Sequence, residues 1–167
     1  MSYLLKPYEK VDSKFNLYYN ASATIGSDEP ITFGSEDTSF GKNFSITKSG
    51  DSFTLPNDNK TYYLEASVVY YNDTIGATNS YLVIQWYDVT NSQYVGIKGI
   101  ITAGKNISEG RAGSIVADEC ARFVTNQSNE YQLRIVSYTG NLSHVDTTTS
   151  AYLASYYNSA RCLVWRY

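Results

Sequence analysis

Apolar and polar residues alternate in short segments along most of the chain, most clearly in the segment 61–71, TYYLEASVVYY. A period of two is typical of a β-strand, whose residues point alternately to opposite faces of a sheet. The even-numbered residues from Tyr62 to Tyr70 form an apolar face that suits a sheet interior. The odd-numbered face still carries Tyr63, Val69 and Tyr71, which a strand facing only water would not need. We therefore expect this second face to contact another surface, and another copy of the same chain is the surface that we expect.

Further alternating segments are separated by polar turns. They predict short strands at residues 15–19, 31–33, 44–47, 53–55, 81–89, 94–102, 131–138 and 162–167. The stretch NSQ joins two of these strands as a hairpin, with Gly96 and Gly99 as candidate β-bulges. The segment 114–124, SIVADECARFV, fits a helix about as well as a strand, and its neighbours favour a strand. This number of short strands and turns predicts a two-sheet sandwich or jelly roll.

Length and composition limit the class of protein. The 167 residues correspond to one ordinary domain, and a hydrophobic content of 43% with a charged content of 17% is typical of a folded chain. The net charge of −3 and the scattered basic residues argue against a nucleic-acid partner, because phosphate binding needs clustered Lys and Arg. No apolar run is long enough to span a membrane, and the N-terminal residues do not resemble a signal peptide.

The residues that usually carry chemistry are scarce. His144 is the single histidine and stands in the polar stretch GNLSHVDTTT, where a solvated side chain is more common than a catalytic base. Adjacent acidic residues occur at 28–29, 36–37 and 118–119, and they leave a carboxylate pair or a calcium site open. We expect no enzyme activity, no cofactor and no metal. Cys120 and Cys162 match no redox or zinc spacing, so we expect two free thiols.

Tyrosine is the compositional anomaly, with 17 residues. A tyrosine ring offers a large contact area with a polar tip, which suits both protein interfaces and platforms for sugars. Most of these tyrosines are expected to pack within the sandwich. In the alternative function of carbohydrate binding, tyrosines and Trp86 or Trp165 would be the stacking platforms.

Four short motifs carry a resemblance to a known family. They are PITF at 30–33, SFTLP at 52–56, KTYYLEASV at 60–68 and YQLRI at 131–135. Together they resemble the C1q/TNF-like jelly roll, in which an aromatic-Thr-x-Pro turn leads into a strand that begins with two aromatic residues. The resemblance implies an all-β fold, a two-sheet antiparallel jelly-roll sandwich, over residues 15–167. The chain departs from the family at its end, where ARCLVWRY replaces the usual Phe-x-Gly-Phe type of strand.

The longer stretches FTLPNDNKTYYLEASV and SYLVIQWYDVTNSQYVG are most similar to C1q-like modules of phage virion proteins. Such modules assemble as homotrimers with their inner sheets packed around a threefold axis. The resemblance therefore implies a subunit interface at Tyr63, Val69 and Tyr71, with Val164 on the last strand as a weaker fourth residue. It also implies a place in the virion, on the capsid surface or a fibre, after synthesis in the host cytoplasm.

Residues 1–14 precede the region of resemblance and are expected to form an N-terminal docking arm. Leu4, Leu5 and Tyr8 would be its apolar anchors on the capsid or on other virion proteins. The expected function is a trimeric, non-enzymatic knob that decorates a capsid, which we favour over a fibre tip because no long shaft is present. The alternative is a carbohydrate-binding module for host-surface glycans at a tail-fibre tip. An extracellular ligand of the C1q type is a third reading, weakened by the lack of a signal peptide.

Overall fold

The computed structural model describes residues 11–17, 26–34, 44, 46–68, 70–72, 80–103, 121–140, 142–144 and 160–167. Within these ranges every named element is a β-strand, and every strand pair is antiparallel. No helix in this part of the chain has the length and apolarity that a membrane span requires. The described protein is therefore all-β, as the alternating pattern predicts.

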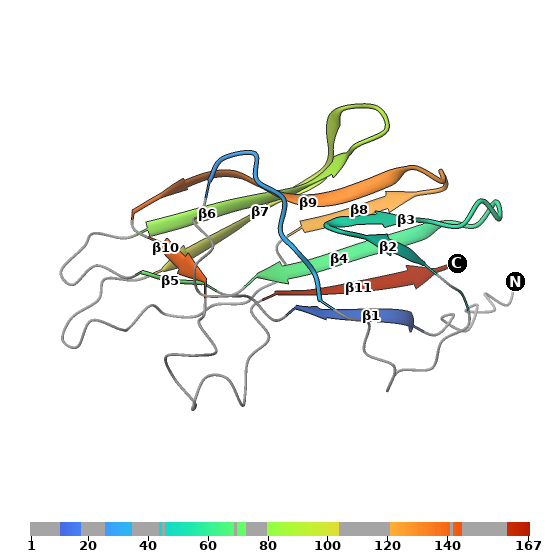
Figure 1. The fold of residues 1–167 in the computed structure, drawn as a ribbon, viewed down its shortest axis with the longest axis horizontal. Helices are drawn as coiled ribbons and strands as arrows, with labels where there is room; N and C mark the ends of the chain where they lie inside the picture. The colour runs from blue at the N-terminus through green and yellow to red at the C-terminus, as the bar shows by residue number, and fades with distance from the viewer. Residues whose placement is uncertain are drawn as a thin grey trace, which may run out of the picture.

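The strands form two main sheets and one small ribbon (Figure 1). A four-stranded sheet has the order β1 (Val11–Leu17), β11 (Ala160–Arg166), β4 (Tyr62–Val68) and β8 (Ala121–Thr125). A five-stranded sheet has the order β2 (Thr47–Ser49), β3 (Ser52–Thr54), β9 (Glu130–Thr139), β6 (Ser80–Asp88) and β7 (Gln93–Ala103). The ribbon pairs β10 (Leu142–His144) with β5 (Tyr70–Asn72).

The connectivity is that of a jelly roll. Without β2 and the β5–β10 ribbon, eight strands remain, and the chain passes repeatedly between the two sheets. One sheet then contains the first, eighth, third and sixth strands, and the other contains the second, seventh, fourth and fifth. This double Greek-key order is the jelly-roll arrangement. The predicted fold class, a two-sheet antiparallel jelly-roll sandwich, is confirmed.

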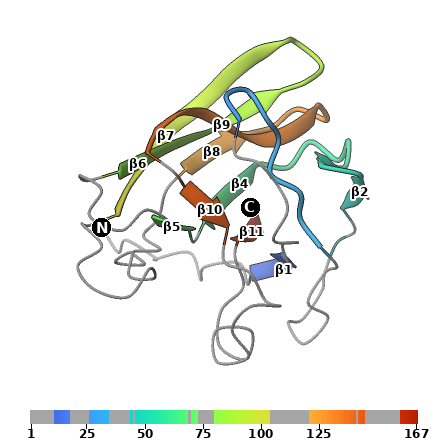
Figure 2. The ribbon, with the colours of Figure 1, turned by 60° about the vertical axis from the view of Figure 1, so that its left-hand side comes forward.

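The core lies between the two main sheets, whose layers are visible in both ribbon views (Figures 1 and 2). On β4 the even-numbered residues are buried, as the alternation predicts. They belong to the same buried cluster as Leu82, Ile84 and Trp86 of β6, which are also fully buried. Phe53 of β3 packs edge-on against Trp86, with ring centroids 6.1 Å apart. Burial of apolar side chains on one face of each sheet is what holds the two layers together.

The predicted strand 61–71 is two strands in the structure. β4 ends at Val68, which pairs with Ala160 at the beginning of β11. The next residues, from Tyr70, pair instead with β10 and leave the sheet. The alternation continues through both strands, so the sequence pattern alone does not reveal the break.

Other local predictions also differ from the structure. Of the predicted strand 44–47, Phe44 and Ile46 lie outside any strand, and β2 begins only at Thr47. Residues 31–34 form no strand, yet Ile31 and Phe33 are buried, and the backbone N–H of Ile31 donates to the carbonyl of Leu133. This segment covers the edge of β9 beyond the end of β3. His144, expected in a loop, lies in β10 opposite Tyr70. Within the ambiguous segment 114–124, residues 121–124 belong to β8, and the rest lies outside the described residues.

A close approach of β7 and β8 closes one side of the sandwich. The 81–89 and 94–102 segments form the predicted hairpin, with a register shift between Ile84 and Trp86 opposite Gly96. Gly96 has a φ of +72°, and a Cβ there would overlap the backbone carbonyl of Arg122. A side chain is therefore excluded both by the backbone conformation and by the space. The expected bulge at Gly96 is confirmed.

Candidate interaction surface

The outer face of the four-stranded sheet carries a row of large apolar side chains. Strand register places Tyr63 of β4 between Trp165 of β11 and Val124 of β8. Tyr63 and Trp165 are half-buried, and Val124 is 57% exposed. Leu163, the next outward residue on β11, is half-buried as well. We call Tyr63, Val124, Leu163 and Trp165 the outer row.

The four residues predicted at a subunit interface have different locations. Tyr63 lies on the outer face, as its place in the alternation requires. Val69 lies outside the described residues, and so does the side chain of Tyr71. Val164 is 0% exposed and belongs to the core, which corrects its assignment. The alternation of β11 turns Val164 inward and leaves the outer face to Leu163 and Trp165.

Sequence reasoning left out Val124 and Leu163 of the outer row, and it named Trp165 only as a stacking platform for sugars. Leu163 and Trp165 share a face by alternation, and this pairing would have identified them if β11 had been placed beside β4. Val124 lies in the segment that fits a helix and a strand equally well, so the sequence does not show to which face its side chain points. The pairing Tyr63–Val124 needs the position of β8 in the sheet, which local pattern does not contain.

One acidic and one basic residue accompany the outer row. Glu65 of β4 lies directly opposite Arg122 of β8, one outward step along the strands from Tyr63 and Val124. Arg122 is exposed and Glu65 is half-buried. Opposite charges that face each other across neighbouring strands stabilise the pairing modestly. The outer face thus combines an apolar row with a balanced pair of charges.

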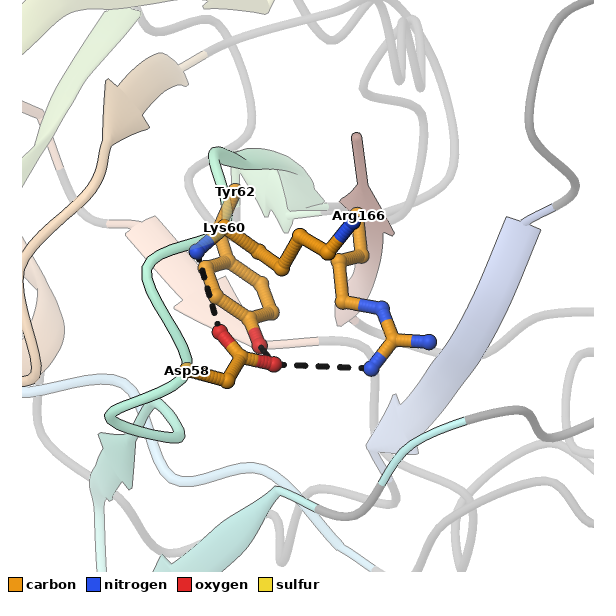
Figure 3. A network of polar contacts seen from close by, with 4 residues as sticks. All are labelled: Asp58, Lys60, Tyr62 and Arg166. Atoms are coloured by element: carbon orange, nitrogen blue, oxygen red, sulfur yellow. Dashed lines mark hydrogen bonds and ion pairs between the residues drawn. The ribbon is translucent and has the colours of Figure 1, made fainter.

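A polar network fastens the turn before β4 to the end of β11, and it accounts for the turn sequence PNDN. The Asp58 carboxylate accepts hydrogen bonds from the Tyr62 hydroxyl at 2.8 Å and the Lys60 backbone N–H at 3.2 Å. It also lies 3.4 Å from the Arg166 guanidinium, so that it stands between the tyrosine and the arginine (Figure 3). Asn59 has a φ of +58°, a conformation that asparagine tolerates better than most residues.

The same end of the sheet is closed by backbone pairing and by aromatic contact. The backbone groups of Thr61 and Tyr167 exchange two hydrogen bonds. The Arg166 guanidinium lies 4.9 Å from the centre of the Phe44 ring, and this ring packs edge-on against Tyr62. Tyr62 is thereby fixed by two contacts, the hydrogen bond of its hydroxyl to Asp58 and the packing of its ring against Phe44.

The network shifts the pKa values of its members. Burial acts to raise the pKa of the Asp58 carboxyl, but the hydrogen bonds from Tyr62 and Lys60 and the charge of Arg166 outweigh it, and the pKa lies below its usual value. Burial, followed by the hydrogen bond to Asp58, raises the pKa of the Tyr62 hydroxyl. Asp58 is therefore charged, and Tyr62 is neutral, across the physiological pH range. This arrangement positions a turn and offers no general acid or base near neutral pH.

One part of the outer face of the five-stranded sheet, around Gln132 and Arg134, is a cluster of polar side chains that bond one another, whereas Tyr81, Ile97, Ile100 and Tyr138 of the same sheet are exposed. The side-chain oxygen of Gln132 accepts from the Nε and Nη2 atoms of Arg134 at 2.9 and 2.8 Å, and its amide donates to the Ser52 hydroxyl. The Arg134 guanidinium stacks over the Tyr87 ring at 3.7 Å from its centre. Gln85 donates to the carbonyl of Gly96, on the bulge of β7. Each of these side chains has a partner within the same face.

Two further groups brace the loops beside this face. Tyr94 packs edge-on against Tyr87 and donates its hydroxyl proton to Asp28; burial, then this bond, raises its pKa to about 12. Asp88 is buried and accepts from the backbone and side chain of Asn91 and from the side chain of Asn129. Burial acts to raise the pKa of Asp88, but these hydrogen bonds outweigh it and lower the pKa. Asp88 thus joins the β6–β7 and β8–β9 loops.

The structure describes only some of the residues that the cysteine and metal predictions concern. Cys162 is a free, fully buried thiol, and burial followed by the charge of Glu65 raises its pKa. Cys120 lies outside the described residues, as do the acidic residues at 36–37 and 118–119. Among the residues that the structure describes, no three His, Cys, Asp or Glu side chains are grouped to hold a metal ion.

The predicted docking arm is only partly described. Leu4, Leu5 and Tyr8 lie outside the described residues. β1 begins at Val11 and pairs with β11, so residues 11–14 belong to the four-stranded sheet and not to a separate arm. The reason is that β11 offers a free edge up to Trp165, which is the partner of Val11. An arm that is distinct from the domain would have to end before Val11.

Comparison with models of known protein families finds no match, and comparison with curated proteins finds none either. Among solved structures, the chain is similar to the PRD1 vertex protein P5, with a TM-score of 0.39 and 13% sequence identity over 94% of this chain and 98% of that one. At this TM-score the likeness carries no argument about this chain. The fold assignment rests on the strand order and pairing described above.

Proposed function

We propose that this protein is a non-enzymatic structural protein of a phage virion, a homotrimeric knob that decorates the capsid surface. The observation that carries the proposal is the outer row on the four-stranded sheet. Large aromatic and aliphatic residues in contiguous positions on a solvent-side sheet face are the usual mark of a protein interface. The resemblance of the motifs around β3 and β4 to phage C1q-like modules supports the virion setting.

A trimer also needs a second patch. In a closed ring of three identical chains, each contact joins two different surfaces of the chain. β7, an edge strand of the five-stranded sheet, carries Ile97 at 62% and Ile100 at 66% exposure. These are the most exposed large apolar side chains in the described part of the protein. Together with the outer row they supply the two surfaces that a ring requires.

The first experiment measures the oligomeric state. Light scattering combined with size-exclusion chromatography should give three times the 18.7 kDa of one chain at micromolar concentration. A mass of one chain under these conditions would contradict the trimer. A mass of two chains would replace it with a twofold contact between outer rows.

The second experiment locates the protein on the particle and tests the docking arm. Labelled protein should appear on the capsid surface when assembled particles are imaged by electron microscopy. Removal of residues 2–10 leaves all of β1 in place and should spare the melting temperature while abolishing co-sedimentation with particles. Leu4, Leu5 and Tyr8 are the proposed anchors, and three arms on one trimer would act together. Co-sedimentation of the truncated protein would show that the jelly roll itself makes the contact.

The alternative function, a carbohydrate-binding module, has less support. Trp86 is 0% exposed and donates its indole N–H to the Ala121 carbonyl inside the sandwich, so it offers no ring to a sugar. Trp165 and the tyrosines of the outer faces remain as stacking groups. A glycan array probed with labelled trimer separates the two functions, since a decoration protein should give no saturable binding.

A further inference from the structure

Three segments of the chain meet at one end of the four-stranded sheet. Strand register places the beginning of β4 beside the end of β11, and the backbone groups of Thr61 and Tyr167 exchange two hydrogen bonds there. β1 runs antiparallel to β11 and begins at Val11, opposite Trp165, so it begins at the same end. The turn before β4 and the end of β11 lie on the same side of the molecule in Figure 1. We call the 56–61 turn and residues 166–167 the turn end.

The covalent chain limits the distance between the turn end and any surface that the docking arm binds. Tyr8, one of the proposed anchors, precedes Val11 by three residues. Three residues span at most about 11 Å, even when they are fully extended. Thr61 and Val11 flank β11 on its two sides, roughly 10 Å apart, because neighbouring strands are about 4.8 Å from each other. A capsid surface that holds Tyr8 therefore lies close to the turn end.

Hydrogen bonds already fix the turn end within the single chain. Asp58 accepts from the Tyr62 hydroxyl and from the backbone N–H of Lys60, and it lies 3.4 Å from the Arg166 guanidinium (Figure 3). Two backbone hydrogen bonds join the 56–61 turn to the residue after β11. A surface that is ordered before it binds loses less conformational entropy on binding than a flexible loop does. The turn end is thus suited to a contact with another protein.

The side chains of the turn end indicate the chemistry of its partner. Those that reach solvent are polar or carry a polar tip: Asn57, Asn59, Lys60, Thr61 and the 46% exposed Tyr167. Arg166 balances the charge of Asp58, so the ammonium of Lys60 gives this surface a net positive charge. A complementary protein surface presents hydrogen-bonding groups and an acidic side chain opposite Lys60.

The outer row also lies near Val11, because Val11 pairs with Trp165. In the proposed function, however, the outer row is used for the contact between copies. A trimer that is closed through the outer row leaves the turn end as the surface beside Val11 that the capsid can reach.

We propose that the turn end is the surface through which the domain contacts the capsid protein, in addition to the docking arm. The domain then has the 56–61 turn and the end of β11 against the particle, and the end of β9 at Thr139 points away from it. The inference rests on the proposed function, because it takes attachment through the arm as its premise. It adds the orientation of the domain and a second contact surface.

Two identical substitutions at opposite ends of the sandwich test this orientation. Thr61 and Thr139 are both exposed. β9 begins at Glu130, which is opposite Thr54 just before the turn, and it ends at Thr139, roughly 30 Å further along the strand. Thr61→Glu places an acidic group beside Lys60, so it should raise the dissociation constant for particles by about tenfold. Thr139→Glu is the matched control and should leave the dissociation constant unchanged. Co-sedimentation at a series of protein concentrations measures both.

Amine labelling of the wild-type protein gives a second measurement that needs no substitution. Lys60 at the turn end and Lys98 on β7 are both exposed. An amine-reactive reagent followed by mass spectrometry compares the free protein with the protein bound to particles. Lys60 should be labelled several times more slowly on particles, whereas Lys98 should be labelled at the same rate in both states.

The outcomes separate this inference from the proposed function. A wild-type protein that does not co-sediment with particles would overturn both. Binding of wild type with equal dissociation constants for the two Glu variants, and with unchanged labelling of Lys60, would overturn the inference alone. If Thr61→Glu melts below wild type, the labelling of Lys60 in the wild-type protein decides. Protection of Lys60 but not of Lys98, together with weaker binding of Thr61→Glu than of Thr139→Glu, would establish the inference.

Discussion

The two main sheets differ in whether polar side chains on their outer faces have hydrogen-bond partners within the chain. On the five-stranded sheet, Gln132 bonds Arg134 and Ser52, and Arg134 covers the ring of Tyr87. On the four-stranded sheet, the outer row presents aromatic and aliphatic side chains, and the Trp165 indole N–H has no acceptor. Both faces belong to the same fold and alternate in the same way along their strands.

The difference shows which face is complete by itself. A face whose polar groups bond one another gains nothing from a partner, because a partner would have to displace existing hydrogen bonds. A face of half-buried aromatic rings gains from being covered, since apolar area leaves water. On the five-stranded sheet only the cluster around Gln132 and Arg134 is complete in this sense, because Tyr81, Ile97, Ile100 and Tyr138 of the same sheet are exposed.

The largest effect is expected from a charge placed in the outer row of the four-stranded sheet. Tyr63→Glu should dissociate the trimer into monomers, because it places three like charges near one axis without partners. Light scattering at micromolar concentration measures the change. Tyr138→Glu is the matched control, because Tyr138 is 37% exposed on β9, which β6 separates from β7, and it should leave the mass at that of a trimer. Equal behaviour of the two variants would remove the distinction between the faces.

The next prediction concerns Gly96, where β7 lies close to β8 of the other sheet. Gly96→Ala should lower the free energy of unfolding by roughly 2–4 kcal/mol, because the left-handed backbone is strained and the new Cβ meets the Arg122 carbonyl. Gly50→Ala is the control, since Gly50 has a similar φ of +55° but nothing within 4 Å of an added Cβ. Urea unfolding should show the smaller loss in the control. Equal losses would mean that the close approach of β7 and β8 contributes nothing.

A third prediction concerns Asp88, whose hydrogen bonds join the β6–β7 and β8–β9 loops. Asp88→Ala should lower the free energy of unfolding by roughly 1–2 kcal/mol at pH 7, because it leaves Asn91 and Asn129 without their acceptor. The folded pKa of Asp88 is lowered, so its contribution is present above the unfolded pKa of about 3.9 and is lost as the pH falls through the folded value. The gap between wild type and variant should therefore shrink below about pH 4. A gap that stays constant to lower pH would show that Asp88 acts through packing.

The smallest expected effect is at the turn before β4. Asp58→Asn keeps an acceptor for Tyr62 but loses the charge that faces Arg166, and both of these charged side chains are partly exposed. Exposed ion pairs contribute little, so the free energy of unfolding should fall by less than about 1 kcal/mol. The difference should diminish in high salt, which thermal unfolding at two ionic strengths measures. A larger loss that salt does not change would assign the effect to the hydrogen bond with Tyr62.

Prediction from the sequence succeeds where the physical cause is local. The alternation of β4 places Tyr62 inward and Tyr63 outward, and both positions agree with the structure. The turn and glycine signals of the β6–β7 hairpin are local as well, and Gly96 forms the bulge. These properties depend on residues close together in the chain.

Prediction fails where a distant partner decides. β4 and β5 differ in their pairing partners, β11 and β10, and the assignment of residues 11–14 to the sheet follows from their pairing with β11. Val164 was assigned to the outer face on the basis of the resemblance, although its neighbours Leu163 and Trp165 alternate with it and occupy that face. In the two strand cases the missing information is the pairing of distant strands, whereas the direction of Val164 could have been read from the local alternation of β11.

The sequence by itself determined the fold class, the inward face of each clear strand and the position of the tight turns, because a period of two and turn chemistry act over a few residues. Only the tertiary structure decided that Tyr63, Val124 and Trp165 form one row. These residues come from three strands that are far apart in the chain, and their adjacency depends on the order β11-β4-β8. The structure likewise decided that Asp58 meets Arg166, because the ends of β4 and β11 coincide only after the strands pair in register. Local pattern fixes which way a side chain points, and strand pairing fixes which other side chain it meets.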